Sequence, residues 1–264
     1  RTGGTFAEGI EVMVRAALQS PDFLYRLETT SPADPSARQV PLSAYELATR
    51  LSFLLWSSGP DDALLDAAAH GELSSKAQVA AKAREMLAHP RARAAIAGFF
   101  QQWTGARRLD VVTKSAASFP DFSPELRDAM AAELPAFVEH VLWSGDGSLK
   151  ALLSEPVAFV NAQLASVYGV PAPASSGASL QLVSLPPEQG RSGILTQAGF
   201  LSVQAHPEQT SPVLRGKFVR AMLLCQPPAP PPNDVDITLP DVTTAKTARE
   251  RLAGHLMAGA SCSG

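Results

Sequence analysis

Residues 41–56 decide the fold class of this chain; they read Pro-Leu-Ser-Ala-Tyr-Glu-Leu-Ala-Thr-Arg-Leu-Ser-Phe-Leu-Leu-Trp. Ser43 and Glu46 form an S-x-x-E capping box, in which each side chain accepts a hydrogen bond from a backbone amide that the first helical turn leaves unpaired. Leu42 and Leu47 have the spacing of a hydrophobic staple across the same helix start. An apolar stripe at 3.6-residue spacing follows, made of Leu47, Leu51, Leu54 and Leu55. The stretch therefore predicts an amphipathic helix that packs against a core.

Helix signals of the same kind continue on both sides of this stretch. Gly59 and Pro60 are expected to end the first helix and open the next, with Pro60 as a first helical residue and Gly71 as the terminator. A long helix is expected to begin behind Ser123-Pro124 and to be kinked at Pro135. Further helices are predicted over residues 75–89, 91–104 (mostly buried), 156–168, from Ser211-Pro212 onward, and 244–257.

Proline and glycine separate the helical segments. Residues 171–177 read as a linker, Leu180 to Ser184 as a short strand, and Pro227 to Pro232 as extended polyproline II. The predicted fold class is mainly α, with a helical bundle-like domain followed by an irregular, Pro-rich helical segment. The expected domains are the C-terminal end of a preceding helical domain (1–30), a helical domain (38–169), a linker or short strand (170–185), and the irregular, Pro-rich helical segment (186–264).

Composition excludes several function classes. The chain has 264 residues, of which 45% are hydrophobic and 18% charged, as in globular proteins. A net charge of −3 supplies no general field for nucleic acid, so no nucleic-acid partner is predicted. No apolar run reaches the ~18–20 residues of a membrane-spanning helix. Two cysteines are too few for a disulfide scaffold or a four-cysteine zinc site.

The histidines do not form a metal motif, and no metal site is predicted. None belongs to an H-E-x-x-H pair or has a cysteine at zinc-finger spacing. Structural roles are expected for most of them, with His70 and His89 at helix C-termini, where an imidazolium interacts favourably with the helix dipole. His206 precedes a proline in an irregular segment and is the candidate for function, because loops carry sites more often than helices do. The remaining two histidines are His140 and His255.

No nucleophile or phosphate-binding motif is present, and no catalytic residue is predicted. The chain lacks a G-x-S-x-G elbow, a P-loop and a dinucleotide fingerprint, and Gly190-Arg191-Ser192-Gly193 lacks the strand–turn–helix context of such motifs. Arg215, Lys217 and Arg220 form a basic cluster on one predicted helix. The cluster is suited to hold a phosphate or a haem propionate, or is simply a solvated helix face.

Cys262 is the residue that points to a cofactor. It follows the last predicted helix, and Ser263 and Gly264 come behind it, as in the first half of a C-x-x-C-H haem-attachment motif. The residues alone also allow a free thiol or a Cys225–Cys262 disulfide, which would stabilise the fold by about 3–4 kcal/mol. The sequence begins at Arg1 and ends at Gly264, and we expect both ends to lie inside a longer protein.

Several stretches together resemble the planctomycete-type cytochrome-associated proteins, which also occur in myxobacteria. In that family, helical domains of unknown function precede a planctomycete cytochrome C-type module, and the resemblance implies that residues 186–264 are the N-terminal part of that module, truncated. The matches run in order along nearly the whole chain. They comprise Leu18 to Arg26 with Glu28, Tyr45 to Trp56 with Pro60 to Asp62, Met86 to Arg91, Phe99 to Trp103, Phe159 to Asn161 with Leu164, Tyr168 and Gly169, Arg191 to Thr196, Thr210 to Lys217, and Arg249 to Leu252.

The resemblance implies that Cys262 is the first haem thioether cysteine of a C-x-x-C-H motif in the intact protein, with haem c as its cofactor. Residues 1–264 alone are not expected to hold a covalent haem. Because haem c is attached outside the cytoplasm, the resemblance also implies a periplasmic or extracellular location.

The function expected on these grounds is the non-haem scaffold part of an extracytoplasmic c-type cytochrome-like protein that transfers electrons with a redox partner protein. One alternative is a substrate- or polymer-handling oxidative enzyme domain served by the downstream haem, which predicts a polar cleft near His206 and Arg215. The other is a structural cell-surface interaction module, which predicts an exposed apolar patch. No oligomeric state is predicted.

Overall fold

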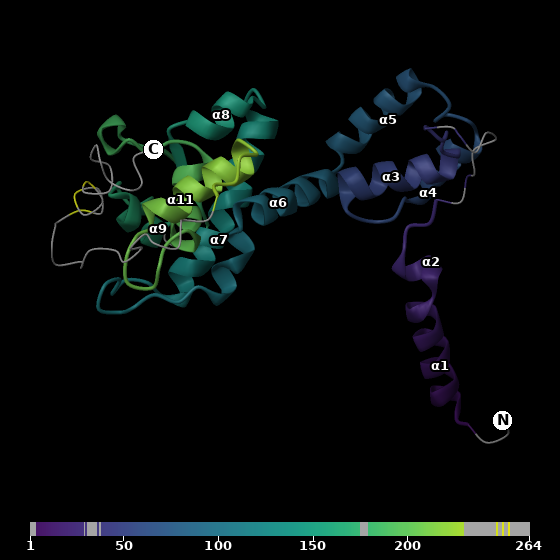
Figure 1. The fold of residues 1–264 in the computed structure, drawn as a ribbon, viewed down its shortest axis with the longest axis horizontal. Helices are drawn as coiled ribbons and strands as arrows, with labels where there is room; N and C mark the ends of the chain where they lie inside the picture. The colour runs from purple at the N-terminus through teal and green to yellow at the C-terminus, as the bar shows by residue number, and fades with distance from the viewer. Residues whose placement is uncertain are drawn as a thin grey trace. The chain divides into compact units, whose positions relative to one another are not determined.

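The structure is a computed structural model that describes residues 4–28, 30, 36, 38–174, 179–229, 247, 250 and 253. The chain divides into two compact units, Arg1–Ile96 and Ala97–Gly264. Both are built mainly from helices, which confirms the predicted fold class (Figure 1).

The first unit has its core between three helices. α3 (Ala44–Trp56) packs against α4 (Asp62–Ala69) and α5 (Lys76–Ala88), as Figure 1 shows. Leu51, Trp56, Leu64 and Met86 are the larger side chains of this buried cluster. Two preceding helices, α1 (Phe6–Gln19) and α2 (Pro21–Leu24), contain no buried residue. The core of this unit therefore lies within residues 44–92.

The capping box that the sequence predicts at the start of α3 is confirmed. The backbone N–H of Glu46 donates to Ser43 Oγ at 3.2 Å, and the backbone N–H of Ser43 donates to Glu46 Oε2 at 2.8 Å. Leu51 is buried, as the apolar stripe predicts, but Leu54 is 76% exposed and its place in the stripe was wrong. The buried residues Ala48, Ser52 and Trp56 recur every fourth residue, so the buried face of α3 follows these positions and Leu54 lies outside it.

The start of α4 also differs from its prediction. Pro60 is not a first helical residue, because Asp61 is the N-cap and α4 begins at Asp62. Asp61 Oδ1 accepts a hydrogen bond from the backbone N–H of Leu64 at 3.0 Å, which satisfies an amide of the first turn. The predicted end is confirmed, since Gly71 follows the C-cap with a φ of 74°.

The helix predicted over 91–104 exists as α6 (Pro90–Thr104), in which the division between the units falls. The prediction that it is mostly buried was wrong. Its buried residues are Ala92 and Thr104, whereas Phe99 is 59% exposed. The apolar residues of this helix are largely alanines, and the arginines and glutamines between them keep much of its surface in water.

The second unit is arranged around α7 (Pro124–Glu139), which continues into a π-helical turn, η2 (His140–Ser144). The helix begins behind the N-cap Ser123, as predicted, and carries a stripe of buried side chains that continues into η2: Leu126, Met130, Leu134, Phe137 and Val141. The elements packed on α7 are η1 (Ala106–Val111), β1 (Val157–Val160), α9 (Ala162–Tyr168) and α10 (Ala198–Val203). The other elements of the unit are α8 (Leu149–Ser154), β2 (Gln181–Ser184), η3 (Pro187–Gln189), η4 (Ile194–Thr196), α11 (Pro212–Phe218) and the π-helical turn η5 (Val219–Leu223).

A two-stranded antiparallel sheet crosses this unit. β1 pairs with β2 in a register that runs from Val157 opposite Ser184 to Val160 opposite Gln181, which confirms the predicted short strand. The helix predicted over 156–168 was wrong in its first part, because Val157 to Val160 form β1. Valine and phenylalanine favour a pleated, half-buried surface, and the helix starts only behind the N-cap Asn161.

Some predictions fall on residues that the structure does not describe. Cys262, His255, most of the predicted proline-rich extended segment and most of the predicted helix 244–257 lie outside the described residues. Thr247 and Glu250 are described, and each accepts a hydrogen bond from the backbone N–H of the other. In the described part of the chain, no helix combines the length and apolar character that a membrane crossing requires.

Candidate functional sites

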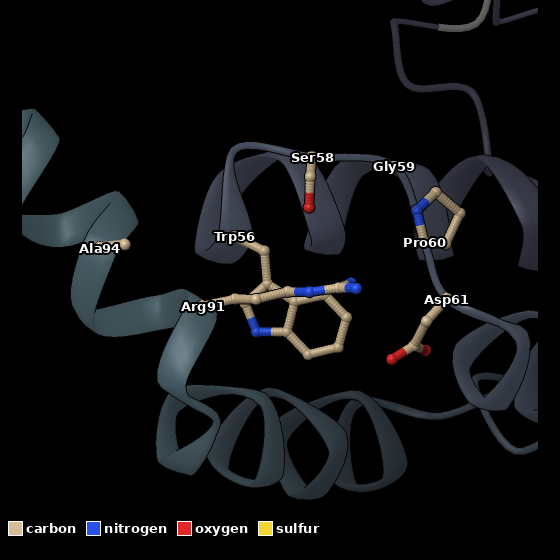
Figure 2. Close-up of a pocket in the computed structure, with 7 residues that line it drawn as sticks. All are labelled: Trp56, Ser58, Gly59, Pro60, Asp61, Arg91 and Ala94. Atoms are coloured by element: carbon tan, nitrogen blue, oxygen red, sulfur yellow. The ribbon is translucent and has the colours of Figure 1, made fainter.

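The first unit carries an open pocket of about 420 Å³ between the end of α3 and the start of α6. Figure 2 shows the Arg91 side chain extending across the face of the Trp56 indole, with Ser58 and Asp61 directed toward the same space. The guanidinium carbon of Arg91 lies 5.4 Å from the ring centre of Trp56, within the range of a cation–π contact. Trp56 Nε1 donates to the carbonyl oxygen of Met86 at 3.0 Å, which fixes the indole plane. The pocket thus offers a rigid aromatic surface and a planar cation.

The polar groups of this first pocket differ in whether they already form hydrogen bonds within the protein. Asp61 holds the α4 N-cap, so its carboxylate has a structural task. Ser58 Oγ is buried and has no hydrogen-bond partner. Among the residues that the structure describes, the lining of this pocket contains no histidine or cysteine, and the Ser58 hydroxyl and the Arg91 guanidinium are hydrogen-bond donors on its side chains.

The second unit contains a buried carboxyl group that the sequence analysis missed. Glu133 on α7 is fully buried, and Tyr168 Oη at the end of α9 donates to its Oε1 at 2.6 Å. Tyr168 Oη also accepts a hydrogen bond from the backbone N–H of Ala198 at 2.8 Å, where α10 begins. Glu133 Oε2 has no hydrogen-bond partner. Three helices are therefore joined through one phenol and one carboxyl group.

Burial controls the protonation of this cluster. It raises the pKa of Glu133 to about 8, against smaller lowering effects from the Tyr168 hydrogen bond and the positive charge of Arg191. Burial also raises the pKa of Tyr168, and the neighbouring Glu133 carboxyl raises it further. Glu133 is therefore mostly protonated at neutral pH, and both side chains are uncharged there.

The position of Glu133 in the sequence of α7 indicates that its side chain is buried. Glu133 is three residues after Met130 and four before Phe137, so it lies on the apolar face that the stripe defines. A glutamate on the buried face of a helix points to an unusual protonation state or a specific partner. The identity of that partner, Tyr168, depends on tertiary packing.

A cavity of about 360 Å³ adjoins this cluster. Its walls are mainly apolar side chains from the loop before α7, from α7 itself, from α9 and from α10: Phe119, Phe122, Leu126, Met130, Val167 and Leu201. Arg191 and Ala198 belong both to the cavity lining and to the surroundings of Tyr168. We refer to this space as the α7–α10 cavity.

The lining of the α7–α10 cavity also contains polar groups. Lys114 Nζ donates to the carbonyl oxygens of Ser202 at 2.9 Å and His206 at 3.1 Å, and partial burial lowers its pKa. Ser202 Oγ is buried without a hydrogen-bond partner. Arg191 Nη1 donates to the carbonyl oxygen of Thr196 at 3.4 Å, and its guanidinium carbon lies 5.1 Å from the Tyr168 ring centre.

The residues that the sequence singled out are not gathered in this cavity. His206 is exposed and contributes its backbone, which contacts Lys114 and Gln209, whereas its side chain does not line the cavity. On α11 and η5, Arg215 is half-buried, which lowers its pKa, while Lys217 and Arg220 are exposed. These three basic residues are not part of the cavity lining either.

The other predicted residues have structural surroundings or are not described. His70 and His89 form the C-caps of α4 and α5, as predicted. His140 Nε2 lies 2.9 Å from Glu155 Oε1. Cys225 is an exposed free cysteine, and Cys262 lies outside the described residues. Among the residues that the structure describes, no group of three or more His, Cys, Asp or Glu side chains is arranged to hold a metal ion.

Two separate parts of the chain match known protein families. The family PSD4, a protein of unknown function (DUF1592), matches residues 42–170. The family PSCyt3, also a protein of unknown function (DUF1588), matches residues 191–264. No curated protein and no solved structure matches the chain. With both planctomycete cytochrome C-type models matched in order, the chain belongs to the planctomycete cytochrome-associated family.

Proposed function

We propose that this chain is the non-haem scaffold part of an extracytoplasmic c-type cytochrome-like protein that transfers electrons with a redox partner protein. The observation that carries the proposal is the match of residues 191–264 to the PSCyt3 family. That range contains Cys262, which is followed by Ser263 and Gly264 as in the first half of a C-x-x-C-H motif. Haem c attachment takes place outside the cytoplasm, which gives the proposed periplasmic or extracellular location.

Cys262 is the proposed first thioether cysteine of a C-x-x-C-H motif in the intact protein. Bound haem supplies one-electron transfer, and its potential is set by the axial ligands and the surrounding polarity. No iron ligand is assigned to the residues that the structure describes. Their proposed task is to provide the folded body that carries the haem-binding segment.

The test is to express the gene through its native codons beyond Gly264 together with a cytochrome c maturation system. We expect a band on a denaturing gel that stains for haem and disappears in Cys262→Ser. Cys225→Ser is the matched control, because Cys225 is exposed and lies before the proline-rich segment; it should keep the stain. A chain that stays unstained, or a stain that survives Cys262→Ser, would overturn the haem proposal.

A second candidate function is the handling of a substrate by an oxidative enzyme domain served by the haem. The observation in its favour is the α7–α10 cavity, whose lining residue Lys114 donates to the carbonyl oxygen of His206. The feature expected of such an enzyme was a polar cleft near His206 and Arg215, whereas this cavity has mainly apolar walls and neither residue belongs to its lining. The binding experiment of the next subsection tests whether this cavity takes a ligand.

A further inference from the structure

We propose that the α7–α10 cavity binds a small organic anion, specifically a carboxylate with an apolar or aromatic body. This inference concerns a ligand site within the second unit and does not rest on the proposed haem attachment. It depends on three properties of the cavity: its apolar walls, the unused hydrogen-bonding capacity of Ser202 and Lys114, and the sign of the charge of its lining.

The walls and the volume suit the body of such a ligand. A volume of about 360 Å³ is within the range of ~300–1,000 Å³ that is usual for small-molecule sites. The ring of Phe119 and the side chains of Leu126, Met130 and Leu201 are among the lining groups. These surfaces favour an aromatic ring or a short alkyl chain, because moving such a group out of water is favourable.

Two polar groups in the lining have hydrogen-bonding capacity that the protein itself does not use. Ser202 Oγ is buried without a partner, which is unfavourable for a hydroxyl group. Lys114 Nζ donates to two backbone carbonyls, and an ammonium group has three N–H bonds. A ligand oxygen bound beside Ser202 and Lys114 would satisfy both groups, which points to an acceptor rather than a donor on the ligand.

The charge at the cavity favours an anion over a neutral acceptor. Lys114 and Arg191 are both half-buried, whereas Asp121, the acidic residue of the lining, is exposed to solvent. Water screens an exposed charge more strongly than a half-buried one, so the two cations dominate the field inside the cavity. The planar guanidinium of Arg191 also matches the geometry of a carboxylate.

The experiment compares three probes of one shape on the full 264-residue chain. Isothermal titration calorimetry is carried out with trans-cinnamate, cinnamyl alcohol and cinnamylamine, which are anionic, neutral and cationic. We expect cinnamate to bind at least about tenfold more tightly than the alcohol, and the amine to bind most weakly. Absence of cinnamate binding at about 10 mM, or binding of the amine as tight as that of the carboxylate, would overturn the proposal.

Two pairs of variants locate the binding. Val167→Trp fills the cavity from a position that is 37% exposed, and Val213→Trp adds the same ring at a position on α11 that is 59% exposed and outside the lining. We expect cinnamate affinity to fall at least about tenfold in the first variant and to change less than about twofold in the second. Equal effects in both variants would place the binding elsewhere and refute the assignment to this cavity.

The second pair tests the charge. Arg191→Gln should weaken cinnamate binding about tenfold while the affinity for cinnamyl alcohol stays within about twofold. Arg220→Gln, an exposed arginine outside the lining, should leave both affinities unchanged. Retained alcohol binding shows that the Arg191→Gln protein still has an intact cavity. Loss of binding of both probes to the same extent would contradict a charge role for Arg191.

Discussion

Glu133 places a carboxyl group inside the second unit, where an ionised carboxylate would lose most of its hydration. One oxygen accepts a hydrogen bond from Tyr168, and the other has no partner. Arg191 acts on it only as a nearby positive charge and does not form an ion pair with it. Because the surroundings compensate an ionised carboxylate so poorly, the protonated form is the stable one.

We expect this carboxyl group to make the protein more stable in mild acid. The pKa of Glu133 rises from 4.5 to about 8 on folding, so the folded state binds a proton that the unfolded state releases between these values. Its contribution to stability is full below about pH 4.5 and is lost as the pH rises toward 8, by up to about 1.4 kcal/mol per pH unit. Urea unfolding at about pH 5, 7 and 9 measures this slope.

Glu133→Gln should remove most of this pH dependence and should be more stable than the natural protein at alkaline pH. The exposed Glu188→Gln is the matched control and should keep the slope of the natural protein. Equal slopes for Glu133→Gln and the natural protein would show that Glu133 is ionised when folded.

Tyr168→Phe tests the hydrogen bonds that join α7, α9 and α10. The substitution removes the hydroxyl group that donates to Glu133 and accepts from Ala198, leaving both partners buried without it. We expect the free energy of unfolding to fall by about 1–3 kcal/mol at neutral pH. Tyr45→Phe, at a position 53% exposed, should change it by less than about 0.5 kcal/mol. A similar loss in both variants would mean that the buried bonds contribute little.

At the scale of elements, Gly190 and Gly193 both have a backbone conformation that favours glycine, but only Gly193 also lacks the space for a side chain. Gly190 and Gly193 have φ values of 61° and 65°, in the region that other residues rarely adopt. A Cβ atom at Gly190 would meet nothing within 4 Å, whereas one at Gly193 would lie 2.2 Å from the backbone carbon of Leu153. Gly193 thus allows the segment before η4 to approach the end of α8.

We expect Gly193→Ala to destabilise the protein much more than Gly190→Ala. Gly190→Ala should lower the free energy of unfolding by about 1–2 kcal/mol because of its φ angle alone. Gly193→Ala adds a backbone clash and should lower it by more than about 4 kcal/mol, or prevent folding. Thermal unfolding followed by circular dichroism compares the two variants. Indistinguishable melting temperatures would contradict the close approach to Leu153.

The sequence predicted those features of the elements that depend on neighbouring residues. The caps at Ser43, Ser123 and Ser211 could be predicted because a cap involves residues only three positions apart. The failures at Leu54 and at Val157 to Val160 have a different origin. Which face of α3 meets the core, and whether Val157 to Val160 find a partner strand, depend on segments distant in the chain.

In the candidate sites too, the features that depend on neighbouring residues could be predicted, and those that depend on tertiary packing could not. The histidine caps of α4 and α5 follow from their positions at helix ends. The α7–α10 cavity collects residues from positions 114 to 210, and no short motif marks them. Lys114 and Ser202 acquire their significance only through the fold, because a lysine and a serine are ordinary residues in a helical protein.

At the scale of the whole molecule, α1 presents apolar side chains that have no core to cover. Phe6 is 85% exposed, Val12 66% and Met13 65%, although the helix has its own capping box at Thr5 and Glu8. An exposed apolar helix is the feature expected of an interaction module, the third function considered above.

Removing residues 1–19 should therefore leave the folded core unchanged. Because α1 has no buried residue, we expect the melting temperature to stay within about 1 °C and the fluorescence of the apolar dye ANS to decrease. Replacing Phe6 and Met13 with glutamate in the full chain should give the same decrease without a change in length. A drop of several degrees on truncation would show that α1 stabilises the core.

The proton held by Glu133 also has a calorimetric consequence. Unfolding at neutral pH releases nearly one proton from this side chain, and the buffer must take it up. The heat absorbed on unfolding then includes the buffer's own heat of protonation. Scans in phosphate and in Tris at equal pH should therefore give different apparent enthalpies. Dividing their difference by the difference between the buffers' enthalpies of protonation gives the net number of protons released on unfolding, which should fall by nearly one in Glu133→Gln. Folding of this unit at neutral pH is therefore coupled to the uptake of a proton from the solvent.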